Sequence, residues 1–267
     1  MKTFASRLRK LVLRVAIATL ALSTFGATAQ PPTRDSRRSG FDFMGASTQA
    51  MQKDDSLNPG MLWVKDGEAL WQRPAGSNAK ACASCHAAAA SSMKGVAAKY
   101  PVFDPLLNRP VTLSQRINQC RQQRQGAEPL RAESQDLLSL ESYVAHQSRG
   151  LPLTPSPDPR LAPFRQQGQQ RFMQPMGQLN LSCAQCHDDN AGKRLGSSQI
   201  PQGHHTGYPV YRLEWQAMGS LQRRLRNCMS GVRAEPFAYG ALELVELELY
   251  LAERATGMVV ETPGVRP

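Results

Sequence analysis

The sequence has few aromatic residues and no apolar run long enough to cross a bilayer as a helix. Aromatic residues make up 6% of the 267 residues. The basic residues are not interleaved with them, so the stripe typical of nucleic-acid binding is missing. No segment after Phe25 reaches the length that a transmembrane helix needs. We therefore expect neither nucleic-acid binding nor a membrane span in the mature chain.

The first 29 residues have the pattern of an export signal. Five basic residues come first, Val15 to Phe25 form an apolar stretch, and Ala27-Thr28-Ala29 is a small-residue cleavage site. We expect cleavage after Ala29, with a retained anchor as the alternative. Removing residues 1–29 lowers the formal charge from +11 to +6. This mild excess is compatible with small anionic substrates or acidic partner surfaces.

Six cysteines in an exported chain would by default predict three disulfides, but the spacing of four of them indicates haem. The C-x-x-C-H signature of c-type haem attachment occurs twice, at Cys82, Cys85 and His86 and at Cys183, Cys186 and His187. A thioredoxin-like redox pair or a zinc site is the alternative. Neither requires a histidine directly after each pair, and the chain has only five histidines. The motifs predict two covalently bound haem c groups, with His86 and His187 as proximal iron ligands.

The chain also repeats itself. VKDGEALWQRPAGSNAKACASCH aligns without a gap with RQQGQQRFMQPMGQLNLSCAQCH at an offset of 101 residues. Further on, KYPVFDPLLNRPVTLSQRINQC matches TGYPVYRLEWQAMGSLQRRLRNC at an offset of 108, which pairs Arg116 with Arg224 and Cys120 with Cys228. At an offset of 107, Glu141 matches Glu248. The sequence therefore predicts two copies of one haem domain.

The duplication predicts an all-α fold of two tandem cytochrome c-like domains. The expected parts are a signal peptide (1–29), an N-terminal arm (30–57), domain 1 (58–150), a proline-rich linker (151–163), domain 2 (164–257) and a C-terminal tail (258–267). Helices are expected at 59–72 and 159–173 before the haem motifs, and at 131–147 and 239–255 at the end of each copy. As in cytochrome c folds, the closing helix is expected to cross close over Gly67 or Gly168. Tyr143 or Tyr250 would then pack on Trp71 or Phe172.

Cys120 and Cys228 remain, and two interpretations compete. They form one disulfide between the domains, or each is the distal ligand of the haem in its own copy. Their equivalent positions favour ligation, and Arg116 and Arg224, four residues before each, would keep the thiolates charged. A thiolate ligand would lower the potential of the iron relative to methionine ligation. Methionine ligands are the remaining alternative, but Met93, Met218 and Met229 do not match between the copies.

The signal peptide, the two haem motifs, the cysteine after each motif and the stretch YPVYRLEWQ…SLQRRLRNC…VRAEP resemble the dihaem SoxA family. Its members are the larger cytochrome subunit of the periplasmic SoxAX complex of sulfur-oxidising bacteria. The resemblance implies an L-cysteine S-thiosulfotransferase in the periplasm. Such an enzyme joins thiosulfate oxidatively to a cysteine of the carrier protein SoxYZ, and electrons pass through haem to the monohaem partner SoxX.

The resemblance also assigns site residues. It implies that Cys228 is the active-site cysteine, able to carry a persulfide, and that Arg224 holds the substrate. Residue chemistry alone does not say which copy is catalytic, because Cys120 has its own arginine, Arg116. A thiosulfate dehydrogenase forming tetrathionate and a pure electron-transfer cytochrome remain alternatives. His204 and His205 are expected in a polar, glycine-rich loop, and His146 on a helix surface.

Overall fold

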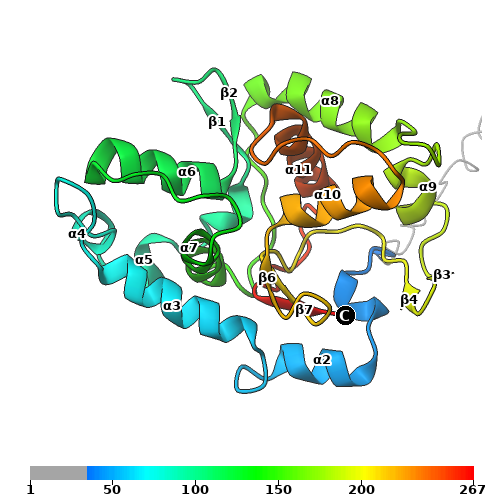
Figure 1. Ribbon diagram of the computed structural model, residues 1–267, viewed down its shortest axis with the longest axis horizontal. Coiled ribbons are helices and arrows are strands. Elements are labelled where there is room, and N and C mark those ends of the chain that lie inside the picture. Colours follow the sequence, from blue (N-terminus) through cyan, green and yellow to red (C-terminus); the bar gives the residue numbers. More distant parts are fainter. Residues whose placement is uncertain (1–34) are drawn as a thin grey trace, which may run out of the picture. The chain divides into compact units, whose positions relative to one another are not determined.

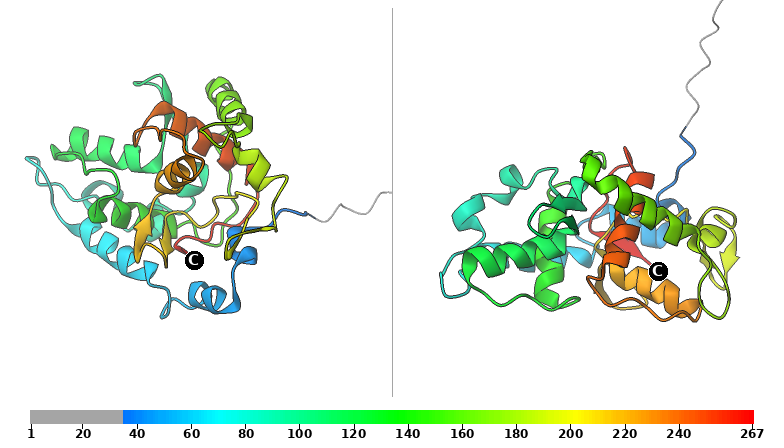
Figure 2. Two further views of the ribbon diagram at one scale, coloured as in Figure 1. Left: turned by 45° about the vertical axis from the view of Figure 1, so that its right-hand side comes forward. Right: turned by 90° about the horizontal axis from the view of Figure 1, so that it is seen from above.

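Two similar sets of helices account for most of the chain in the computed structural model, which describes residues 35–267. The predicted signal peptide (1–29) and the start of the predicted arm (30–34) lie outside the described residues. Residues 37–267 form one compact unit (Figures 1 and 2). Within the described part, no helix combines the length and the apolar character that crossing a membrane requires.

Each copy follows the same order: a long helix, the haem-motif helix, a β-hairpin, a cysteine-bearing helix and a closing helix (Figure 1). In the first copy these are α3 (Gly60–Gln72), α4 (Ala83–His86), β1 (Val102–Asp104), β2 (Arg109–Val111), α6 (Leu113–Cys120) and α7 (Gln135–His146). In the second copy they are α8 (Ala162–Met173), α9 (Cys183–His187), β5 (Val210–Arg212), β6 (Ala217–Gly219), α10 (Leu221–Gly231) and α11 (Leu242–Arg254). The shared order supports the predicted duplication.

The other elements are short. The first copy also contains α5 (Ala89–Ser92), the 3-10 turn η2 (Ala97–Lys99) and the π-helical turn η3 (Arg121–Gln125), and the second contains β3 (Arg194–Leu195) and β4 (Ser198–Gln199). The 3-10 turn η4 (Pro159–Leu161) leads into α8. The predicted arm contains η1 (Gly40–Phe43) and α2 (Ala46–Lys53), and the predicted tail contains β7 (Gly264–Arg266).

The four predicted helices are confirmed to within a few residues at each end, as α3, α8, α7 and α11. The two cysteine-bearing helices begin where a hydroxyl side chain caps them. Thr112 accepts a hydrogen bond from the backbone N–H of Gln115 (3.2 Å), and Ser220 accepts one from Arg223 (3.1 Å). These caps satisfy backbone donors that a first helical turn leaves free. They fix the starting points of the helices that carry Cys120 and Cys228.

The closing helix of each copy crosses directly over the predicted glycine. A Cβ on Gly67 would collide with the backbone carbonyl of Ser139, and one on Gly168 with that of Glu246. The tyrosine and the aromatic ring pack as expected, with ring centroids 5.9 Å apart for Trp71 and Tyr143 and 5.4 Å apart for Phe172 and Tyr250. The predicted crossing is therefore confirmed in both copies.

Short strands correct the prediction of an all-α fold. Each copy has an antiparallel hairpin between its haem motif and its cysteine-bearing helix, β1–β2 or β5–β6. In the second copy, β7 pairs in parallel with β5, so the predicted tail is part of the sheet. Strands of three residues are too short to show the alternation that identifies a strand in sequence. The chain is helix-rich and duplicated, with small sheets beside the helices.

The predicted linker lies along both copies. Residues 151–158 contain no helix. The N–H of Leu153 donates to the carbonyl of Met258 (2.8 Å), and the N–H of Thr154 donates to that of Ala98 (2.9 Å). Leu153 is buried. The segment thus joins the end of the second copy to the middle of the first, while the exact domain boundaries stay a prediction.

Candidate functional site

Each C-x-x-C-H motif forms one helical turn that ends at its histidine. In α4 the N–H of His86 donates to the carbonyl of Cys82 (3.0 Å). In α9 the hydroxyl of Ser182 accepts from the N–H of Gln185 (3.1 Å) and caps the turn. Residues three apart on a helix share one face. Both thiols of each motif can therefore meet the edge of one porphyrin.

The orientation of His187 suits an iron ligand. Its Nδ1 lies 2.7 Å from the carbonyl oxygen of Pro201, so Nδ1–H donates there and Nε2 is the nitrogen left for another partner. Gly203 packs against the ring, where a side chain would crowd the imidazole. The ring position and the tautomer are thus both set by the loop that follows the haem motif.

Cys228 and His187 interact directly. Burial alone would raise the pKa of the Cys228 thiol. The hydrogen bond to His187, and then the charges of Arg224 and Arg212, outweigh that effect and bring the pKa below its ordinary value. The neighbouring Cys183 behaves oppositely, since burial and then Cys228 raise its pKa to about 11. One sulfur is stabilised as an anion and the other as a neutral thiol, as a ligand and an attachment thiol should be.

The first copy contains the equivalent residues, with Trp71 beside the histidine of its haem motif. The rings of Trp71 and His86 are 5.8 Å apart, and the Trp71 indole N–H donates to the carbonyl of Ala87 (3.0 Å). Cys120 lies close enough to Cys82 to affect it. Burial raises the pKa of Cys82, Arg121 opposes the rise, and Cys120 adds to it. The sulfurs of Cys120 and Cys82 therefore lie near each other in this copy too.

The alternatives for the two remaining cysteines find no support. All six cysteines lie within residues 35–267, and all are free, so Cys120 and Cys228 are not bonded to each other. Met218 and Met229 are core residues with exposed fractions of 1% and 3%. Met93 packs against the core of the first copy. The structure thus uses these methionines for packing, as their unmatched positions indicate.

The arginines before the two cysteines differ in their partners. In the first copy, Arg116 forms an ion pair with the buried Asp104, at 3.0 Å between Nη1 and Oδ2. Asp104 also accepts from Gln119 (3.0 Å) and from the N–H of Leu106 (2.8 Å). Burial alone would raise the pKa of Asp104, but these hydrogen bonds, followed by the charge of Arg116, hold it below its usual value. The charge of Arg116 is therefore neutralised.

Arg224 has no such buried carboxylate. Burial tends to lower the pKa of its guanidinium, but Cys228, Tyr208 and Glu214 together raise it, with Cys228 contributing most. At an offset of 108, the position of Asp104 is occupied in the second copy by Arg212. The charges of two guanidinium groups thus act on the Cys228 sulfur, where the first copy has an ion pair.

A model of the SoxA/TsdA cytochrome c domain matches the chain twice, over residues 66–153 and 167–260. The chain belongs to the SoxA/TsdA cytochrome c family. Covalently bound haem c is therefore its cofactor, in line with the donors described above. In each copy these donors are two thiols on one helical turn, a histidine, and a cysteine sulfur close to them.

Several relatives of this SoxA/TsdA chain are named L-cysteine S-thiosulfotransferase subunit SoxA. The protein from Pseudaminobacter salicylatoxidans is 41% identical over 234 residues, covering 87% of this chain and 82% of the relative. The protein from Rhodovulum sulfidophilum is 37% identical, covering 87% and 81%. The crystal structure of SoxXA from P. pantotrophus superposes with a TM-score of 0.83 at 35% identity, covering 86% of this chain and 87% of that one.

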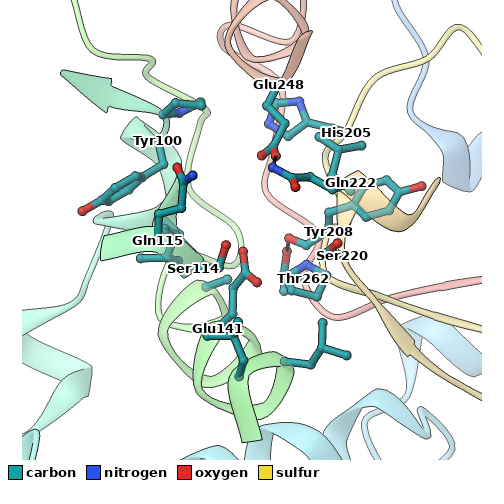
Figure 3. A pocket seen from close by; sticks show the side chains of 18 of the residues that line it. Tyr100, Ser114, Gln115, Glu141, His205, Tyr208, Ser220, Gln222, Glu248 and Thr262 are labelled. Atoms are coloured by element: carbon teal, nitrogen blue, oxygen red, sulfur yellow. Dashed lines mark hydrogen bonds between the residues drawn. The ribbon is translucent and has the colours of Figure 1, made fainter. Parts of the chain in front are cut away.

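A cavity of about 250 Å³ lies where the two copies of this SoxA/TsdA chain meet (Figure 3). Residues that match in the repeat line it from both sides, namely Tyr100 with Tyr208, Leu113 with Leu221, and Glu141 with Glu248. No lysine or arginine is among its lining residues. Burial raises the pKa of Glu141 to about 8 and that of Glu248 to about 7. The cavity is thus a neutral-to-acidic space, unsuited to an anionic substrate.

The remaining histidines are only partly as expected. His204 and His205 lie in an irregular segment, as predicted, but His205 also lines the cavity between the copies. Burial lowers the pKa of His205 to about 4, so its ring is neutral. His146 is half-buried, and burial lowers its pKa, so its prediction as a surface residue is wrong. We assign none of the three to haem ligation.

Sequence reasoning missed Arg212. The signal was present, because YPVFD aligned with YPVYR places an acid opposite a base. Its meaning depends on β1 and β5, whose last residues these are. Without the strands, nothing indicated that position 104 faces Arg116, or that position 212 faces Arg224.

Proposed function

We propose that this chain is the dihaem subunit of an L-cysteine S-thiosulfotransferase, acting in the periplasm with a SoxX-type monohaem cytochrome. It joins thiosulfate to a cysteine of a SoxYZ-type carrier: Cys–SH + S₂O₃²⁻ → Cys–S–S–SO₃⁻ + H⁺ + 2 e⁻. A sulfur–sulfur bond forms, the carrier thiol loses its proton, and two electrons leave through the cytochrome pair. The names of the relatives support the activity, and the SoxXA structure supports the partner.

The observation that carries the proposal is the environment of Cys228. The Cys228 sulfur lies beside His187, and two guanidinium groups act on it and lower its pKa. Thiosulfate is a dianion, and fixed positive charge in a partly buried site binds such a group strongly. The first copy offers Arg116 already paired with Asp104. This difference favours the second copy as the place where substrate is captured.

The residues then take the following roles. Cys82 and Cys85, and Cys183 and Cys186, would attach the two haem groups, and His86 with Cys120 and His187 with Cys228 would hold the irons. When bound, haem c supplies the electron-accepting chemistry. Pro201 keeps Nε2 of His187 free to act as the proximal donor. Arg224 holds thiosulfate with its outer sulfur toward Cys228.

Cys228 is the reacting sulfur. Its lowered pKa favours the thiolate, the form that bonds to sulfur electrophiles. The Cys228 thiolate can take the outer sulfur of thiosulfate as a persulfide while sulfite leaves: Cys–S⁻ + S₂O₃²⁻ → Cys–S–S⁻ + SO₃²⁻. The other two thiols of this copy, Cys183 and Cys186, would be used for haem attachment. Arg224, one helical turn before Cys228 on α10, places the substrate on the same face of the helix.

The test is product analysis with the holoprotein, its cytochrome partner, thiosulfate and the carrier. We expect thiosulfate consumption that requires the carrier thiol, and a carrier whose cysteine bears the thiosulfonate group. Tetrathionate formed without carrier would instead identify a thiosulfate dehydrogenase. If thiosulfate causes no electron release at all, the remaining hypothesis is a cytochrome that only transfers electrons and has no substrate of its own.

The duplication provides a matched pair of variants. Cys228→Met keeps a sulfur ligand but cannot form a sulfur–sulfur bond, so we expect conjugation to be lost. Cys120→Met makes the same change at the equivalent position, and we expect a smaller loss together with a changed absorption spectrum. Equal losses in both variants would mean that Cys228 acts as a ligand only.

A further inference from the structure

Asp104 and Arg212 occupy the same place in the two copies. Each is the last residue of the first hairpin strand, β1 or β5, and is paired with the first residue of the second strand. In the first copy this position puts Asp104 3.0 Å from Arg116. The equivalent position in the second copy places Arg212 close enough to Arg224 for their charges to interact, and the charge at this position is reversed between the copies.

Arg212 is held in place by its surroundings. Only 9% of the residue is exposed, and all three residues of β5 are buried. Its guanidinium lies 5.1 Å from the centre of the Trp215 ring. The buried Nε has no hydrogen bond of good geometry and is 3.3 Å from a carboxylate oxygen of Glu214. A donor of this kind, fixed and only partly satisfied, is ready to bind an acceptor.

The two arginines repel each other. Burial lowers the pKa of Arg212, and the charge of Arg224 lowers it further, while Glu214, Tyr208 and Cys228 oppose the change. Placing two like charges side by side in a buried region costs free energy unless an anion joins them. Glu214 offsets part of this cost, but its side chain is 51% exposed and a ligand can displace it.

We propose that Arg212 is a second anion-binding residue of the Cys228 site, which holds the sulfonate oxygens of a thiosulfate-type dianion together with Arg224. This inference rests on the proposed function. Two guanidinium groups match a dianion in charge, and their planar N–H forks suit a group with several oxygens. With the sulfonate end fixed by both arginines, the outer sulfur is left to face Cys228.

The same position disfavours a dianion in the first copy. Asp104 there neutralises Arg116, so this pair adds no net positive charge beside Cys120. The residue at the end of the first hairpin strand is acidic in one copy and basic in the other. This difference thus decides which haem site accepts a dianion. This explains how two copies with equivalent cysteines can differ in function.

The test compares Arg212→Gln, Arg212→Lys and Glu214→Gln in the assembled holoprotein. Because charge-assisted hydrogen bonds to the sulfonate would be lost, Arg212→Gln should raise the KM for thiosulfate at least about tenfold. The KM for the carrier should not change. Arg212→Lys should recover part of the loss, since charge is kept without the fork. Glu214→Gln should lower the KM for thiosulfate, because it removes a competing carboxylate.

Arg223→Gln is the matched control. Arg223 precedes Arg224 on α10 and stacks on the same Trp215 ring, at 4.1 Å from its centre. Its loss removes one positive charge from the region, and we expect less than a twofold change in the KM for thiosulfate. Equal effects of Arg212→Gln and Arg223→Gln would overturn the inference and indicate only a general electrostatic field.

Failure of this inference is distinguishable from failure of the proposed function. If the wild-type protein consumes thiosulfate with the carrier and Arg212→Gln has an unchanged KM, Arg212 is not a binding residue. If the wild-type protein shows no such reaction, the same variants are compared by calorimetric titration with thiosulfate alone. Weaker binding to Arg212→Gln and tighter binding to Glu214→Gln would then still support the site, and identical binding would reject it. Melting curves and haem spectra identify any variant that fails to fold.

Discussion

The half-buried carboxylates between the two copies make stability depend on pH, and Glu141→Gln tests this. Glu141 points into the cavity (Figure 3), with Glu248 and Glu133 among its lining residues and no cation. Burial is the main reason why its pKa rises from 4.5 to about 8, and Glu248 and Glu133 raise it further. The folded protein therefore holds a proton that the unfolded chain has lost at neutral pH.

The sign and size of the effect follow from this difference. Between about pH 4.5 and pH 8 the folded state binds more protons than the unfolded state, so stability falls as pH rises and levels off above pH 8. Each tenfold change in proton affinity corresponds to about 1.4 kcal/mol. At pH 7 the penalty for Glu141 is thus at most about 3 kcal/mol, because water in the cavity reduces it.

Glutamine keeps the shape of protonated glutamate and never ionises. Glu141→Gln should therefore be more stable than the wild type at pH 7, with a melting temperature higher by up to about 6–12 °C for a chain of this size. The difference should shrink toward pH 5 and grow toward pH 8. The assay is thermal unfolding of the holoprotein from pH 5 to pH 9.

Glu68→Gln is the control for this experiment. Glu68 is an exposed residue of α3, the helix that packs against α7. Its substitution should leave the pH profile of melting unchanged. The reasoning is refuted if the profile of Glu141→Gln runs parallel to that of the wild type, since Glu141 would then be ionised in the folded protein.

Two further changes test the fold. Gly168→Ala should lower the free energy of unfolding by several kcal/mol, and with it the melting temperature, because the new Cβ would meet the Glu246 carbonyl. Gly231→Ala is the control and should be tolerated, because nothing lies near its Cβ. Equal melting temperatures for the two variants would contradict the close helix crossing. Asp104→Asn should destabilise the chain by roughly 1–3 kcal/mol, since it weakens the ion pair with Arg116. The wild type should lose this contribution as pH falls, because the pKa of Asp104 is depressed. Asp104→Asn should therefore lose less stability than the wild type at acidic pH, and the same loss in both proteins would contradict this explanation.

The duplication made much of the fold predictable. Helical periodicity and the matched glycines were local signals, so α3 with α7 and α8 with α11 could be paired before the structure was known. The close crossings at Gly67 and Gly168 then followed, since only glycine allows two backbones to approach so closely. The haem donors were equally local, because their spacing is itself the chemical requirement.

The rest depends on contacts between distant residues. β7 pairs with β5 across more than fifty residues, and neither strand is long enough to be recognised from a sequence pattern. Glu141 and Glu248 matched in the repeat, but only the packing of the copies shows that they face one cavity. The role of Arg212 likewise became visible only in the structure, where the end of β5 brings it within the electrostatic influence of Arg224.

The central claim is that the Cys228 sulfur, held between His187 and two arginines, is where thiosulfate sulfur is captured. Peptide mass spectrometry of the holoprotein after reaction with thiosulfate tests it most directly. We expect the peptide containing Cys228 to gain about 32 Da, the mass of one sulfur atom, and the peptide containing Cys120 to stay unmodified. Added sulfur on Cys120 instead, or a disulfide joining the two cysteines, would contradict the account.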